Sequence, residues 1–171
     1  MKLPPVLSSR HKEAISLMKR MLCVLLTLLL CAASAQADTV LETVDYDNAA
    51  EISTKSQDGL YLYVVLEDGT AGITGYLGDE TALVIPSVVD DLHVTAIGAY
   101  AFEYAALTSV VIPEGVTVID CEAFAAASAL KEITLPSTLR EIGEEAFIGC
   151  ALEKVTLSEG VETLGERAFA G

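Results

Sequence analysis

The stretch that decides the fold reads Leu130-Lys-Glu-Ile-Thr-Leu-Pro-Ser-Thr-Leu-Arg-Glu-Ile-Gly-Glu-Glu-Ala-Phe147, and the same phrase recurs along the chain. Further copies run from Leu107 to Phe124 and from Leu152 to Phe169, and one with a longer spacer runs from Leu83 to Phe102. The closing phenylalanines stand at 102, 124, 147 and 169, so their spacings are 22, 23 and 22 residues. This fixed period predicts a solenoid, because one such unit cannot bury its apolar side alone.

Apolar side chains occupy seven fixed positions of the phrase, and we expect them to face the core. Burying one aliphatic side chain stabilises the fold by about 1.5 to 3 kcal/mol, so the rows offset the cost of ordering only when neighbouring copies cover them. The predicted inward rows are Leu107, Val110, Ile112, Val116, Ile119, Ala123 and Phe124; Leu130, Ile133, Leu135, Leu139, Ile142, Ala146 and Phe147; and Leu152, Val155, Leu157, Val161, Leu164, Ala168 and Phe169.

The period and the LxxLxL arrangement fall in the range of leucine-rich repeats. The fuller pattern LxxIxLPxxLxxIGxxAF, from Leu130 to Phe147, resembles the BspA-like leucine-rich repeat family of bacterial surface proteins, and the match covers Tyr61 to Gly171. The expected fold is mainly β, a short right-handed leucine-rich-repeat solenoid of about four repeats with an N-terminal β-hairpin cap.

The predicted cap occupies residues 60–80. Leu60–Leu66 and Ala71–Tyr76 are rich in β-branched and aromatic residues, and the turn Glu67-Asp-Gly-Thr70 lies between them. Asp-Gly between two such runs is a strong hairpin signal. We expect the hairpin to cover the first of the repeats, which occupy residues 81–171, the last of them incomplete.

Proline and glycine mark the bends of each copy. Pro113 and Pro136 follow a short predicted strand, where a missing N–H is tolerated. Gly98, Gly143 and Gly165 mark a second bend. Asp120 replaces glycine in one copy, and we interpret this as a left-handed backbone conformation that Asp can also adopt.

Charged residues one copy apart have opposite signs. If copies stack in register, Lys131 meets Glu153, Glu132 meets Lys154, Arg140 meets Glu162 and Glu145 meets Arg167. Each exposed pair contributes about 0.2 to 1 kcal/mol, so the set tunes register more than stability.

The N-terminal segment has the features of an export signal. Met18-Lys-Arg20 is basic, Leu22–Cys31 is apolar, and Ala35-Gln-Ala37 is a small-x-small cleavage pattern. We predict a Sec-type signal peptide over residues 1–37, with Met18 as an alternative start and cleavage after Ala37. The apolar run is shorter than the roughly 20 residues of a spanning helix, so no transmembrane segment is expected in the mature chain. The acidic residues 38–59 are expected to form a linker or lead-in.

The charge balance excludes one class of partner. The 171 residues carry a net charge of -15, from 10 basic and 25 acidic residues. Removal of residues 1–37 leaves 5 basic and 24 acidic residues, a net charge of -19. Nucleic acid is a poor partner because phosphate binding needs clustered lysine and arginine. A basic or cation-bridged protein ligand fits this charge better.

The cysteines could serve in lipid attachment or in a disulfide. A cysteine after an apolar run can mark a lipoprotein, but Leu30 before Cys31 disfavours that processing. Cleavage after Ala37 leaves Cys121 and Cys150, which lie at different phases of the repeat. A bridge needs Cα atoms within about 7 Å, so we favour two separate thiols over a disulfide, with Cys150 packed as a small apolar residue.

Few residues offer catalytic or metal-binding chemistry. Asp90-Asp-Leu-His93 holds the one histidine after residue 37, and a structural role is the stronger interpretation. Glu144, Glu145 and Glu166 could imitate a glycosidase pair or a cation site, but an acidic solvated face explains them better. Asp45-Tyr-Asp-Asn48 lacks the glycine and distal glutamate of a calcium loop. We therefore predict no enzyme activity, no cofactor and no metal.

The resemblance implies an exported protein-binding module at the cell surface, in adhesion or recognition of host or neighbouring-cell proteins. The alternative is a structural spacer or presenting domain of a larger surface protein or cell-wall enzyme. We expect a monomer or end-to-end contact through an uncapped C-terminal repeat. The candidate protein-binding surface comprises Lys131, Glu132, Arg140, Glu144, Glu145, Glu153, Lys154, Glu162, Glu166 and Arg167.

Overall fold

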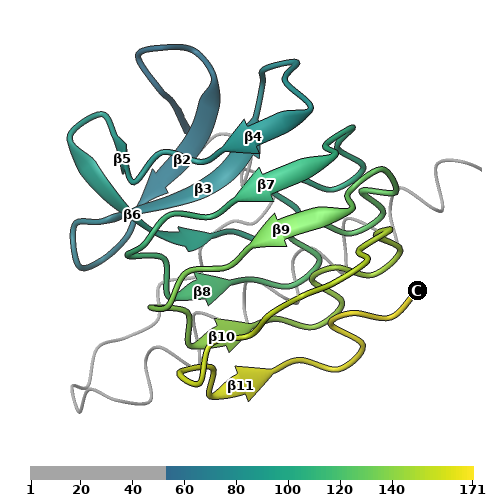
Figure 1. Cartoon of the computed structure of the whole chain (residues 1–171). Helices are drawn as coiled ribbons and strands as arrows, with labels where there is room; N and C mark the ends of the chain where they lie inside the picture. Colours follow the sequence, from purple (N-terminus) through teal and green to yellow (C-terminus); the bar gives the residue numbers. More distant parts are fainter. Residues whose placement is uncertain (1–52) are drawn as a thin grey trace, which may run out of the picture. The chain divides into compact units, whose positions relative to one another are not determined.

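The computed structural model describes residues 53–171, which form eleven β-strands and no helix (Figure 1). The predicted signal peptide and most of the predicted acidic lead-in lie outside the described residues. The strands are β1 (Thr54–Lys55), β2 (Tyr61–Val65), β3 (Ala71–Tyr76), β4 (Ala82–Val84), β5 (Val88–Val89), β6 (Leu92–Ile97), β7 (Ser109–Val111), β8 (Val118–Ile119), β9 (Glu132–Thr134), β10 (Glu141–Ile142) and β11 (Thr163–Leu164).

The strands stack as two sheets that form two sides of a coil. Sheet A has the order β1-β2-β3-β6-β8-β10-β11, with β5 paired to β6, and sheet B has the order β4-β7-β9. In Figure 1, the arrows of β7 and β9 run opposite to those of β8 and β10, as successive sides of one winding must. The prediction of a mainly β leucine-rich-repeat solenoid of about four repeats is therefore confirmed.

Equivalent residues of successive copies pair with each other. Ile97 pairs with Ile119 and Ile119 with Ile142, so parallel strands meet at intervals of 22 and 23 residues. On the other side, Val110 of β7 pairs with Ile133 of β9. The period seen in the sequence is thus the length of one coil.

The four repeated phenylalanines form a column through the core. Neighbouring ring centroids lie 4.9 Å apart for Phe102 and Phe124, 5.2 Å for Phe124 and Phe147, and 5.0 Å for Phe147 and Phe169. Adjacent rings are within 9° of parallel. Strands in a sheet lie about 4.7–4.9 Å apart, so the hydrogen-bonded spacing of the coils sets the spacing of the rings.

The N-terminal hairpin covers the first coil, as predicted. Strands β2 and β3 pair antiparallel, and β3 then pairs parallel with β6, with Ile73 beside Ile97. Tyr76 extends the aromatic column, with its ring 6.3 Å from that of Phe102. Strand β1 lies inside the segment assigned as a linker, and the sequence did not predict it. It pairs antiparallel with β2.

A ladder of turns closes each coil after sheet A. The N–H of Phe124 donates to the carbonyl of Ala146 at 2.8 Å, and that of Phe147 to the carbonyl of Ala168 at 2.8 Å. The turns need left-handed backbone, with φ of 51° at Glu122, 53° at Glu145 and 55° at Arg167. Hydrogen bonds from each turn to the next hold these residues in that conformation.

The left-handed interpretation of Asp120 was wrong. Neither Asp120 nor the glycines at its position, Gly143 and Gly165, has a positive φ. At positions 143 and 165, glycine leaves room for the backbone of the preceding coil. A Cβ on Gly143 would lie 2.4 Å from the nitrogen of Cys121, and one on Gly165 would lie 2.3 Å from the nitrogen of Glu144. The side chain of Asp120 instead accepts a hydrogen bond from the N–H of Cys121 at 2.6 Å.

The predicted inward row is buried throughout the second copy, whereas in the fourth copy Ala168 is buried and the other six residues are half-buried or exposed. Val116, Ile119 and Phe124 are fully buried, whereas Leu164 is 53% exposed and Leu157 is 41% exposed. Burial of a row requires a coil on each side, and the outer side of the fourth coil is uncovered in the described part of the chain.

Cys121 and Cys150 do not bridge each other, as their different repeat phases predict. Cys150 is a free thiol whose Sγ donates to the carbonyl of Phe124 at 3.1 Å. Burial raises the pKa of the Cys150 thiol to about 11. Cys121 is disulfide-bonded, so the prediction of a thiol at that position was wrong.

Candidate functional site

The charged residues predicted to meet across the coils do so in all four pairs, three of them through their side chains. Lys131 Nζ lies 3.7 Å from Glu153 Oε1, and Arg140 Nε lies 3.8 Å from Glu162 Oε1. Arg167 donates a hydrogen bond to Glu145. Glu132 and Lys154 meet through a parallel β-bridge, but within residues 53–171 their charged groups form no ion pair.

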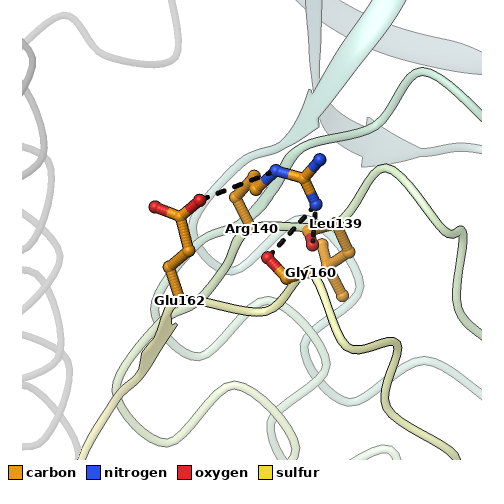
Figure 2. Close-up of polar contacts among 4 residues, drawn as sticks. All are labelled: Leu139, Arg140, Gly160 and Glu162. Atoms are coloured by element: carbon orange, nitrogen blue, oxygen red, sulfur yellow. Dashed lines mark hydrogen bonds and ion pairs between the residues drawn. The ribbon is translucent and has the colours of Figure 1, made fainter.

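Arg140 ties the third coil to the fourth through two contacts and makes a third within its own coil (Figure 2). Its Nη1 donates to the carbonyls of Gly160 at 3.1 Å and Leu139 at 3.3 Å, while its Nε faces Glu162. The Arg140 guanidinium thus forms an ion pair with Glu162 and also donates two backbone hydrogen bonds. Glu162 remains largely exposed, with 77% of its side chain accessible.

The ten predicted surface residues fall into three groups. Lys131, Glu132, Glu153 and Lys154 lie at sheet B. Arg140 and Glu162 flank β10 and β11 of sheet A. The remaining four, Glu144, Glu145, Glu166 and Arg167, lie in the turn ladder that follows sheet A. All are exposed except Glu145, which is half-buried. The repeat period predicted which residues meet across coils, but it did not predict the position of each residue around a coil.

The sheet B group lines a groove of about 680 Å³. Its floor includes the half-buried Ile133 and Leu135, and Leu157 borders it from the fourth coil. The lining combines these apolar side chains with the charged groups of Lys131, Glu132, Glu153 and Lys154. A smaller hollow of about 200 Å³ beside Tyr76 and Phe102 contains none of the ten residues.

The groove lies where the fourth coil departs from the strand pattern. Val84 pairs with Val111 and Val111 with Thr134, so β4, β7 and β9 each contribute three paired residues. The fourth coil continues this sheet only at Lys154, which pairs with Glu132. Ser158, which also lines the groove, has a buried hydroxyl with no hydrogen-bond partner in the described part of the chain. The sequence did not single out this departure or Ser158.

Asp90, in the cluster from Asp90 to His93, has a structural role. Asp90 and Asp91, with φ of 47° and 67°, form the turn between β5 and β6. The carboxylate of Asp90 accepts hydrogen bonds from the hydroxyl of Tyr63 at 3.0 Å and from the N–H of Gln57 at 3.0 Å. Burial and this hydrogen bond raise the pKa of Tyr63. Asp90 therefore fastens the cap to the first coil.

Among residues 53–171, the carboxylates Glu144, Glu145 and Glu166 do not gather into one site, and the motif from Asp45 to Asn48 lies outside the described residues. Glu145 is held by Arg167, while Glu144 and Glu166 are exposed. Within residues 53–171, no three His, Cys, Asp or Glu side chains gather in a way that could hold a metal ion. The same residues include no helix long and apolar enough to cross a membrane.

Comparison with known proteins identifies the repeat. Residues 95–171 match the family model described as BspA type leucine rich repeat region. The sequence matches none of the curated proteins.

Three solved structures illustrate the similarity. A leucine-rich repeat protein from Bacteroides capillosus is 34% identical with a TM-score of 0.61, and the match covers 69% of this chain and 90% of that one. The T. pallidum leucine rich repeat protein is 29% identical with a TM-score of 0.57, over 68% of this chain and 67% of that one. A leucine rich cell surface protein from Faecalibacterium prausnitzii is 25% identical with a TM-score of 0.52, over 80% of this chain and 48% of that one. Repeat proteins of this kind are typically non-catalytic and bind other proteins.

Proposed function

Because the chain belongs to the BspA-type leucine-rich repeat family, we propose that it is an exported, non-catalytic module that binds proteins at the cell surface. The groove at sheet B is the proposed contact surface. The observation that supports it is the meeting of Lys131, Glu132, Glu153 and Lys154 around an apolar floor in one hollow. The predicted signal peptide and the surface protein among the similar structures support export.

The groove offers both signs of charge to a partner. Lys131 and Glu153 neutralise each other, whereas Glu132 and Lys154 form no ion pair within residues 53–171 and can bind charged groups of a ligand. The net charge of -19 after removal of residues 1–37 accelerates encounter with a basic partner, and added salt screens that attraction. We therefore propose a protein ligand with a basic or cation-bridged contact surface, in adhesion to host or neighbouring-cell proteins.

Binding to immobilised extracellular-matrix proteins tests this proposal. The variant with alanine at Lys131, Glu132, Glu153 and Lys154 should lose saturable binding. The control has alanine at Arg140, Glu162, Glu166 and Arg167, which also removes two basic and two acidic groups, and it should keep binding. Loss in the control with retention in the groove variant would move the site away from sheet B. A chelator distinguishes a cation-bridged contact, which it abolishes, from direct contact with a basic surface.

A structural spacer or presenting domain of a larger surface protein or cell-wall enzyme is the second candidate. This candidate is supported by the length of one similar structure, because the chain covers only 48% of the F. prausnitzii protein. Failure of every protein ligand to bind, together with attachment of the chain to a longer surface polypeptide in cell extracts, would favour this role.

A further inference from the structure

One side of the groove at sheet B is a strap, residues 155–159, which is fastened at both ends but not along its length. Before it, the N–H of Glu153 donates to the carbonyl of Lys131 at 3.2 Å. After it, the N–H of Glu162 donates to the carbonyl of Arg140 at 2.7 Å. Figure 1 shows an arrow for β11 in this coil and none for the residues equivalent to β9. Within the described residues, the strap borders the groove without a hydrogen bond to β9.

The third coil has a backbone donor that the strap does not use. The N–H of Ile112 in the second coil donates to the carbonyl of Thr134 in the third at 3.0 Å. The equivalent donor one coil on is the N–H of Leu135, which has no acceptor within residues 53–171. By the period of the repeat, its acceptor would be the carbonyl of Thr156 in the strap. The third and fourth coils therefore lack a hydrogen bond that joins the second coil to the third.

The strap has the length and the sequence that pairing needs. Lys131 and Arg140, which fasten the third coil to the second, are nine residues apart, and so are Glu153 and Glu162 of the fourth coil. The first three residues of the strap, from Val155 to Leu157, repeat the aliphatic-threonine-leucine pattern of the third copy. Because equal lengths of chain span equivalent attachment points, the strap can follow β9 without stretching and without a change of register.

The strap departs from the earlier copies at Ser158, where they have Pro86, Pro113 and Pro136. Proline restricts the residue before it to extended backbone, so Leu157 lacks a constraint that its equivalents have. The hydroxyl of Ser158 is buried and has no hydrogen-bond partner in the described part of the chain, which disfavours the present course of the strap. The strap is thus less constrained than its equivalents and incompletely hydrogen-bonded where it lies.

We propose that the strap closes onto β9 as a fourth strand of sheet B and fills the groove, so that a ligand binds only the open form. In the closed form, the N–H of Leu135 donates to the carbonyl of Thr156, and Leu157 packs against Leu135. A ligand shifts the equilibrium because it binds one of the two forms. Closure regulates the contact surface proposed above, so this inference rests on the proposed function.

Hydrogen exchange at the amide of Leu135, followed by NMR in the full chain without a ligand, tests closure. Ser158→Pro restores the proline of the earlier copies. The turn accommodates it, because the carbonyl of Ser158 accepts the N–H of Val161 at 3.3 Å just as that of Pro136 accepts the N–H of Leu139 at 3.3 Å. Since proline at 158 favours an extended Leu157, this variant should slow exchange at Leu135 at least tenfold.

Two further variants serve as controls. Thr156→Pro removes an N–H that a paired strap would donate to β9, so exchange at Leu135 should be at least as fast as in the unaltered chain. Pro113→Ser makes the reverse substitution after β7, which is held between β4 and β9, and it should leave exchange at Leu135 unchanged. Circular dichroism and thermal melting establish that each variant is folded. Closure is overturned if Ser158→Pro does not slow this exchange, or if Thr156→Pro slows it as much.

Binding to the immobilised matrix proteins separates closure from the proposed function. Ser158→Pro should weaken saturable binding by the factor by which it slows exchange at Leu135, because both quantities follow the open fraction. Pro113→Ser should keep full binding. Slowed exchange with undiminished binding would overturn the claim that closure fills the groove. If the unaltered chain binds no matrix protein, the proposed function alone is overturned, and slowed exchange in Ser158→Pro still supports closure.

Discussion

The ring of Phe124 lies 4.9 Å from that of Phe102 with 3° between the ring planes, and both side chains are buried. Each is the closing residue of its copy of the phrase, so the contact joins equivalent positions of successive coils. A ring of the column contributes most where a coil covers it on both sides, because the stabilisation grows with the apolar area buried. Phe169, at the outer coil, is only half-buried.

Removing a ring should therefore cost more in the middle of the column than at its end. We expect Phe124→Ala to lower the free energy of unfolding by about 3 to 5 kcal/mol, and Phe169→Ala by clearly less. Urea unfolding of the two variants measures this difference. Equal losses of unfolding free energy in the two variants would mean that covering a ring on both sides adds no stability.

The ion pair between Lys131 and Glu153 predicts a coupling that depends on coil stacking. Reversing the charge at either residue should destabilise the chain, and reversing both should be milder than the sum, with a coupling of about 0.2 to 1 kcal/mol that weakens in salt. A double-mutant cycle by thermal melting measures it. The cycle for Lys131 and Glu162, which are not paired, should show no coupling. Additive losses for the first pair would contradict the register.

Replacement by alanine should destabilise the chain more at Gly143 than at Gly149. Gly143→Ala places a Cβ 2.4 Å from the nitrogen of Cys121, so we expect a loss of about 3 kcal/mol or more. Gly149 has a φ of 70°, but Ala126 holds the equivalent position one coil earlier at 55°, so Gly149→Ala should cost only about 1 kcal/mol. Denaturant unfolding compares them. If Gly149→Ala were the more damaging change, close approach of the coils would not be the reason for glycine at position 143.

The Cys150 thiol should react slowly in the folded chain. Burial raises its pKa to about 11 from an ordinary 9.0, so the fraction of reactive thiolate at pH 8 is far smaller than in the unfolded chain. The raised pKa also contributes stability that is present below about pH 9 and is lost as the pH rises towards 11. A thiol-reagent assay at pH 8, with and without urea, measures the difference, and Cys150→Ser supplies the background. Equal rates in the two states would show that the thiol is not protected.

The sequence predicted contacts between coils well, because a fixed period makes residue i the neighbour of its equivalent one copy later. Lys131 and Glu153 were identified in this way, as were the phenylalanines. Position around the coil was harder, because the phrase does not state where each strand ends and each turn begins. The groove at sheet B could therefore not be separated from the charges of the turn ladder.

Local backbone conformation was the least predictable feature. Glu122 and Glu145 adopt left-handed φ values that a single sequence gives no reason to expect. The hydrogen bonds from one turn to the next hold them there, so the cause lies in the neighbouring coil. Glycine was misread for the related reason that its role at positions 143 and 165 is to leave space for the backbone of the preceding coil.

The most direct test of the stacked architecture is the set of nuclear Overhauser contacts among the rings of Phe102, Phe124, Phe147 and Phe169 in a chain labelled only at phenylalanine. Neighbouring centroids at 4.9 to 5.2 Å predict contacts between consecutive rings along the series and none between Phe102 and Phe147. Missing contacts between consecutive rings, or a contact that skips a coil, would contradict the account.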